Sequence, residues 1–117
     1  MVSYYVIPGL KVRPKKLKKL YNHEYIIDIV CKHFQCSREE LFMKSRLGYV
    51  VFQRHICQYL LMCYSPLGCK AIGIFFGQDH TTVLHAERTI KKELNHKFDN
   101  EYKIHIEELI NKIKYES

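Results

Sequence analysis

Residues 71–94 have the sequence AIGIFFGQDHTTVLHAERTIKKEL, and this stretch decides the fold that we predict. Apolar residues recur at helical spacing up to Phe76, and Gly77 then interrupts the pattern. Asp79 is a suitable N-cap for a second, longer helix, whose apolar face begins only at Val83. A short helix, a tight turn and a longer helix make a helix-turn-helix, a motif whose second helix can place its N-terminal residues against base edges.

The first turn of this second helix is polar in a way that helix propensity does not explain. His80, Thr81 and Thr82 are mediocre helix formers. Their side chains suit a DNA major groove, because threonine can hydrogen-bond a base edge or contact a thymine methyl group, and histidine can donate or accept. Asp79 could accept from a cytosine amino group, and the amide groups at a helix N-terminus favour a nearby phosphate. From the residues alone, a well-capped helix start that faces solvent remains an equal alternative.

The rest of the sequence predicts an all-α domain of about six helices. Asn22 can cap a first helix, and residues 37–40, Ser-Arg-Glu-Glu, form a capping box at the start of a second. An amphipathic pattern over roughly residues 49–64 predicts a third, and Asp99 can cap the last one. Together with the helix-turn-helix, these elements make residues 22–117 a single domain that ends in a C-terminal helix.

Residues 1–21 are predicted to form a separate, basic N-terminal arm. They contain six lysine or arginine residues and no acidic residue, and their prolines disfavour a helix. Residues 41–78 add four basic residues and no acidic one, and the whole chain has a formal net charge of +7. This charge favours an acidic partner such as double-stranded DNA, although a solvated tail remains the alternative for the arm. Residues 99–117 are acidic on balance, so the last helix is expected to pack on the domain or to contact a protein partner.

Several other classes of function are disfavoured by the sequence. No apolar run approaches the roughly 20 residues of a membrane span, and no signal peptide is recognisable, so we expect a cytoplasmic protein without a membrane partner. No G-x-x-x-x-G-K-[ST] motif occurs, which argues against nucleotide binding. His80 and His85 lie roughly 140° apart around a helix and cannot easily share a metal ion. The five cysteines form no C-x-x-C pair and no catalytic signature. We therefore predict no enzymatic activity, no cofactor and no metal.

One longer motif suggests a family. Residues 77–86, GQDHTTVLHA, resemble the GRDHTTVLHA signature of the C-terminal DNA-binding domain of the bacterial replication initiator DnaA. The capping box, the loop at residues 44–46, a long helix with Arg54 and the segment Ala71-Ile72-Gly73 precede it in the order of that family. The resemblance covers about residues 22–95. It implies an all-α, Trp-repressor-like helix-turn-helix fold that binds double-stranded DNA sequence-specifically, in DNA replication initiation or its regulation.

The resemblance also implies which residues contact DNA. The residue that corresponds to Arg46 enters the minor groove, Arg54 matches a residue at the DNA backbone, and residues 79–82 correspond to readers of the major groove. An arginine is well suited to the minor groove, because narrow AT-rich grooves concentrate negative potential. The complete set of predicted DNA-binding residues is Lys44, Arg46, Arg54, Lys70, Gln78, Asp79, His80, Thr81, Thr82 and His85.

The chain departs from the family pattern at four places. Gln78 replaces the arginine before the aspartate, and one glycine of the usual pair is missing, so the turn is one residue shorter. Cys69-Lys70 replaces Leu-Pro, and Gly48 stands where a further arginine is frequent. We therefore expect the preferred site to share only part of a DnaA box. Lys70 could restore a phosphate contact, and Gln78 could pair with adenine or only cap the turn.

Two alternative functions stay open from the sequence. The chain could be a transcription regulator that uses the same helix-turn-helix on an unrelated operator. It could also be an interaction protein that targets the replication initiator, through its C-terminal helix and the apolar residues 1–10.

Overall fold

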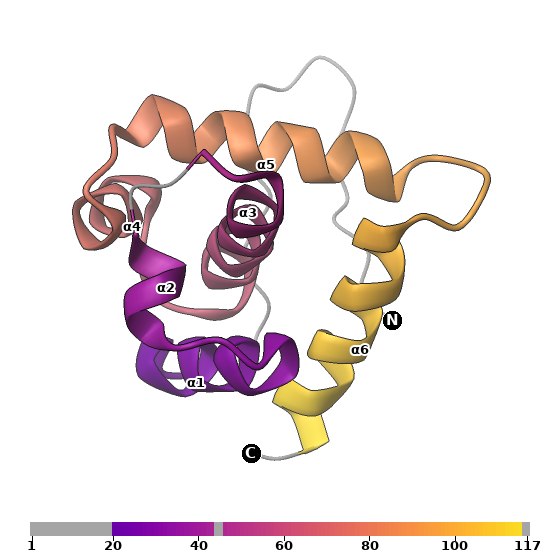
Figure 1. Cartoon of the computed structure of the whole chain (residues 1–117), viewed down its shortest axis with the longest axis horizontal. Coiled ribbons are helices and arrows are strands. Elements are labelled where there is room, and N and C mark those ends of the chain that lie inside the picture. The colour runs from indigo at the N-terminus through magenta and orange to yellow at the C-terminus, as the bar shows by residue number, and fades with distance from the viewer. Residues whose placement is uncertain (1–19, 44–45, 116–117) are drawn as a thin grey trace.

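The computed structural model describes residues 20–43 and 46–115, and these residues form six helices and no strand (Figure 1). The predicted all-α class is thus confirmed. Most of the predicted arm, the basic residues 11–19 included, and Lys44 lie outside the described residues. The helices are α1 (His23–Phe34), α2 (Arg38–Phe42), α3 (Gly48–Tyr64), α4 (Cys69–Phe76), α5 (His80–Leu94) and α6 (Glu101–Tyr115).

The first two helices start at the caps that the sequence predicts. The Asn22 side chain accepts a hydrogen bond of 2.8 Å from the Glu24 N–H at the start of α1. Ser37 and Glu40 form both hydrogen bonds of the predicted capping box at the start of α2. These bonds satisfy amide groups that have no partner within their own helix.

The predicted cap of the last helix was wrong by one residue. Asn100, and not Asp99, caps α6: its Oδ1 accepts a hydrogen bond of 3.0 Å from the Lys103 N–H. Its Nδ2 donates to the carbonyl of Glu93 in the last turn of α5, at 2.9 Å. An amide both donates and accepts, whereas an ionised carboxylate only accepts, so asparagine can satisfy the two helix ends together and aspartate cannot.

Helix α3 is the centre of the domain and contacts every other described helix (Figure 1). Ile56, Leu60 and Leu61 are completely buried along it. α5 crosses one side of α3, α4 packs against both, and α1 lies on the other side, so the apolar face of each helix is covered. The buried helix α3 therefore supports both helices of the helix-turn-helix.

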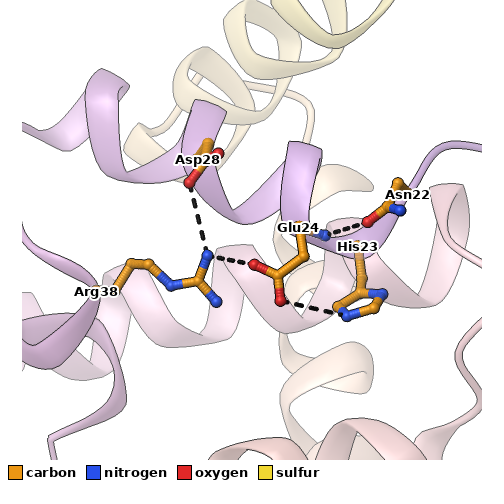
Figure 2. A network of polar contacts seen from close by, with 5 residues as sticks. All are labelled: Asn22, His23, Glu24, Asp28 and Arg38. Atoms are coloured by element: carbon orange, nitrogen blue, oxygen red, sulfur yellow. Dashed lines mark hydrogen bonds and ion pairs between the residues drawn. The ribbon is translucent and has the colours of Figure 1, made fainter.

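Polar contacts attach the short helix α2 to α1. The Arg38 guanidinium donates to the Glu24 carboxylate and lies 3.6 Å from Asp28 Oδ1, while His23 Nε2 lies 3.5 Å from the other Glu24 oxygen (Figure 2). The hydrogen bond from Arg38 lowers the pKa of Glu24. Because exposed ion pairs contribute little free energy, this network is better described as orienting α2 than as stabilising the fold.

Helix α6 closes the domain against α1. The Tyr25 hydroxyl donates to the carbonyl of Ile113 at 2.8 Å. The His33 ring lies between His105 and Lys112 of α6, with its Nε2 2.9 Å from His105 Nδ1 and its Nδ1 2.8 Å from Lys112 Nζ. No helix within the described ranges is long and apolar enough to cross a membrane.

Candidate nucleic-acid interface

The turn between α4 and α5 depends on two glycines. Gly77 ends α4 with a φ of 66°, a left-handed conformation that glycine adopts without steric cost. The Gln78 N–H then donates to the Gly73 carbonyl at 2.7 Å. A Cβ atom on Gly73 would lie 2.6 Å from the carbonyl oxygen of Gln78 and 3.3 Å from the His80 nitrogen. Gly73 therefore allows the two helices of the motif to approach each other.

The start of α5 presents polar side chains to solvent. Asp79 is the N-cap residue, as predicted, and has an extended backbone, although its carboxylate makes no regular capping hydrogen bond. Its Oδ1 lies 3.0 Å from His80 Nδ1. The neighbouring Thr81 hydroxyl is the main cause of a lowered pKa of Asp79, so this carboxylate is ionised at neutral pH. Thr81 and Thr82 are exposed, and Val83 is the first buried residue of the helix.

The exposed face of α5 continues beyond its first turn. His85 is exposed on it, and so are Arg88 and Lys92 in the following turns. With Thr81, these residues follow the spacing i, i+4, i+7 and i+11, which places them on one side of a helix. Arg88 and Lys92 were not among the residues predicted from the sequence, although helical periodicity could have identified them.

Helix α3 supports the loop that carries the predicted minor-groove arginine. The Arg54 side chain is buried, with 8% of its residue surface exposed, and its Nη2 donates to the carbonyl of Met43 at 2.8 Å. This bond holds the chain at the end of α2, just before the loop to α3. Burial lowers the pKa of Arg54. Arg46 itself is exposed, two residues before α3 begins.

Helix α3 also supports the turn before α5. The Gln58 Nε2 donates to Oε1 of Gln78 at 2.7 Å, although Gln58 is only 1% exposed. Burial, with further contributions from Arg54 and His85, lowers the pKa of His55. Gln58 was not among the residues predicted from the sequence. A polar residue inside the apolar stripe of a helix is the signal that could have indicated it.

The remaining predicted residue, Lys70, is exposed in the first turn of α4. In the described ranges, no group of three or more histidine, cysteine or acidic side chains is arranged to hold a metal ion. The site therefore offers hydrogen-bond donors and acceptors at the start of α5. Exposed cations lie on the loop between α2 and α3, on α4 and on the rest of α5.

Comparison with known proteins identifies the family. Residues 23–90, which run from the start of α1 into α5, match the family model described as bacterial DnaA protein helix-turn-helix. The chain belongs to this family. The resemblance predicted for residues 22–95 is thus confirmed, and the helix-turn-helix of the DnaA family is formed here by α4 and α5.

Individual members of the DnaA family align over most of the chain. The chromosomal replication initiator protein DnaA of Bacteroides thetaiotaomicron is 37% identical over 90 residues, which are 76% of this chain and 19% of that protein. DnaA of Nautilia profundicola is 36% identical over 107 residues, 91% of this chain and 24% of that protein. DnaA of Rhizobium meliloti is 43% identical over 70 residues, 59% of this chain and 15% of that protein. The chain thus spans a quarter or less of the length of these relatives.

Proposed function

We propose that this chain binds double-stranded DNA sequence-specifically through α5, in DNA replication initiation or its regulation. One observation carries the proposal. The chain belongs to the DnaA helix-turn-helix family, and the first turn of its second helix exposes Thr81 and Thr82 beside Asp79 and His80. The relatives are replication initiators, which supports a replication role over a role at an unrelated operator.

Within this proposal the residues have distinct tasks. Residues 79–82 read base edges in the major groove, where hydroxyl, imidazole and carboxylate groups distinguish base pairs. Arg46 enters the minor groove, and Lys70 and His85 contact phosphates, as does Lys44. Arg54 acts indirectly, because its buried guanidinium binds the Met43 carbonyl and so positions the loop that carries Arg46.

Selection of bound sites from random duplexes, followed by titrations at several salt concentrations, tests the proposal. We expect a defined motif that shares only part of a DnaA box, because Gln78, Cys69 and Lys70 replace family residues. We also expect log affinity to fall linearly with log salt, with a slope that steepens by roughly 0.9 for each phosphate contacted. A slope near zero, or no binding at low salt, would contradict the proposal and favour an interaction protein. A motif unrelated to any part of a DnaA box would favour a transcription regulator.

A further inference from the structure

The hydrogen bond between Gln58 and Gln78 connects the protein core to the turn that precedes the recognition helix. Gln58 lies on α3 among fully buried apolar residues such as Leu60 and Leu61. Its Nε2 donates to Gln78 Oε1 at 2.7 Å. Gln78 is partly exposed and directly precedes Asp79, the N-cap of α5. A core residue thus holds the side chain of a residue at the edge of the candidate interface.

This bond contributes little to the stability of the core. The Gln58 Oε1 atom is buried and has no hydrogen-bond partner among the described residues. Such a buried acceptor lowers stability, because it has lost its hydrogen bonds to water and makes no hydrogen bond that replaces them. A leucine of similar volume would fill the same position without that cost. The benefit of glutamine at position 58 therefore lies in what it does to Gln78.

The bond fixes the orientation of the Gln78 amide at the turn before α5. Oε1 of Gln78 accepts one hydrogen bond, from Gln58, and an amide oxygen has a second lone pair that can accept another. The Nε2 group, with its two N–H donors, makes no hydrogen bond within the described part of the chain. A Gln78 side chain held in this way can donate to a base, or pair with adenine through its oxygen and nitrogen together.

We propose that Gln58 is a positioning residue that holds the Gln78 amide in one orientation for contact with a base in the major groove. This inference rests on the proposed function. Of the two options that the sequence left for Gln78, it assigns the base contact and not the cap of the turn.

The first experiment tests the amide pair without DNA. The side-chain NH₂ resonances of Gln78 are assigned by their loss in Gln78→Ala and followed by ¹⁵N NMR. Gln58→Leu should shift these resonances and should leave the melting temperature unchanged or higher. Gln53→Leu is the matched control, since it makes the same change on α3 at a partly exposed position on a different side of the helix. Unmoved Gln78 resonances in Gln58→Leu would overturn the proposal, even if the protein binds DNA as expected.

The second experiment measures base preference with duplexes that differ at single base pairs. Gln78→Ala should abolish discrimination at one base pair, the one that the Gln78 amide contacts. Gln58→Leu should reduce discrimination at that same base pair by about fivefold, the value expected for one neutral hydrogen bond. The double variant should be no worse than Gln78→Ala, because the two residues act as one unit. Gln53→Leu should retain the wild-type preference.

Three results would overturn the inference in this second experiment. Gln78→Ala could leave the preference at every base pair unchanged. Gln58→Leu could weaken binding to all duplexes equally, as a purely structural residue would. Finally, the wild type could fail to bind any duplex. That last result would reject the proposed function as well, and the NMR result would show whether the amide pair itself exists.

Discussion

At the scale of residues, exposed and buried side chains separate within three positions of α5. Thr81 and Thr82 are exposed, whereas Val83 is completely buried against the core. Side chains at the start of the helix can therefore change without removing apolar contacts. Arg54 and Gln58 differ from these residues, since both are buried. Arg54 donates to the Met43 carbonyl, and Gln58 donates to the Gln78 side chain.

The triple substitution of His80, Thr81 and Thr82 by alanine should abolish sequence preference and preserve the fold. Each good base contact provides on the order of 1–3 kcal/mol of discrimination, so the variant should bind all duplexes near its non-specific level. Binding to a selected and a scrambled duplex, together with a thermal melt, measures both effects. Retained preference in a folded variant would mean that α5 does not read the sequence.

Gly73→Ala should destabilise the helix-turn-helix. Helix propensity alone favours alanine by about 1 kcal/mol. The new Cβ would, however, lie 2.6 Å from the backbone oxygen of Gln78, which cannot move without shifting the turn. We expect a net loss of about 1–2 kcal/mol in unfolding free energy, measured by urea denaturation, and weaker DNA binding.

Gly48→Ala is the control for this substitution. A Cβ on Gly48, in the first turn of α3, would meet nothing within 4 Å. This variant should be as stable as the wild type or more so. If Gly73→Ala were equally stable, the close approach of the two helices would not be required for folding.

At the scale of elements, the contact between α1 and α6 depends on the protonation of His33. The Lys112 ammonium can only donate, so His33 Nδ1 must accept and Nε2 must carry the proton that it donates to His105. Burial is the main cause of a lowered His33 pKa, Lys112 and His105 lower it further, and Glu108 opposes them. A protonated His33 would bring two donors together at Nδ1 and lose the bond to Lys112.

Acid should therefore loosen this helix pair. Since the His33 pKa is lower in the folded than in the unfolded state, the unfolded chain binds more protons, and stability falls as the pH drops below about 6.5. His33→Gln keeps one donor and one acceptor but cannot titrate. It should reduce the dependence of unfolding free energy on pH between about 5 and 7, by roughly 1 kcal/mol for one hydrogen bond. The part of the dependence that is due to His55, whose pKa burial also lowers, should remain.

Urea denaturation at several pH values measures this effect, with His96→Gln at an exposed histidine as the control. The Glu24 carboxyl does not confuse the result, because its lowered pKa confines its own loss of stabilisation to more acidic conditions. A wild-type pH slope in His33→Gln would show that His33 does not control the α1–α6 contact.

At the scale of the whole molecule, the predicted arm should contribute affinity without sequence preference. Residues 1–19 contain six of the basic residues and no acidic one. Lysine and arginine side chains in such a segment neutralise phosphates. Each neutralised phosphate steepens the slope of log affinity against log salt by roughly 0.9. Deletion of residues 1–19 should weaken binding to every duplex and flatten the salt slope, while the ranking of sites survives.

Titrations of a preferred and a scrambled duplex at two salt concentrations distinguish the arm from α5. The arm deletion should lower the affinity for both duplexes and keep the preference between them. The triple alanine variant should lose that preference. If the deletion erased preference and the triple variant did not, sequence reading would belong to the arm.

The amino-acid sequence by itself was sufficient for the helices, the helix-turn-helix and the family. Helical periodicity, the caps at Asn22 and Ser37 and the break at Gly77 are local signals, which depend on residues only a few positions apart. The DnaA-like signature is likewise one continuous stretch. The cap of α6 was misplaced by one residue, because Asn100 was favoured by a bond to Glu93 that belongs to another helix.

Only the tertiary structure decided which residues of other helices support α5 and the turn before it. Gln58 contacts Gln78 across 20 positions of sequence, and His33 contacts His105 across 72. Neither partner can be inferred from periodicity, which shows the face of a helix that is buried but not the residue that it meets. Such pairs depend on how whole helices pack around α3, and packing is determined by the shapes of many side chains together.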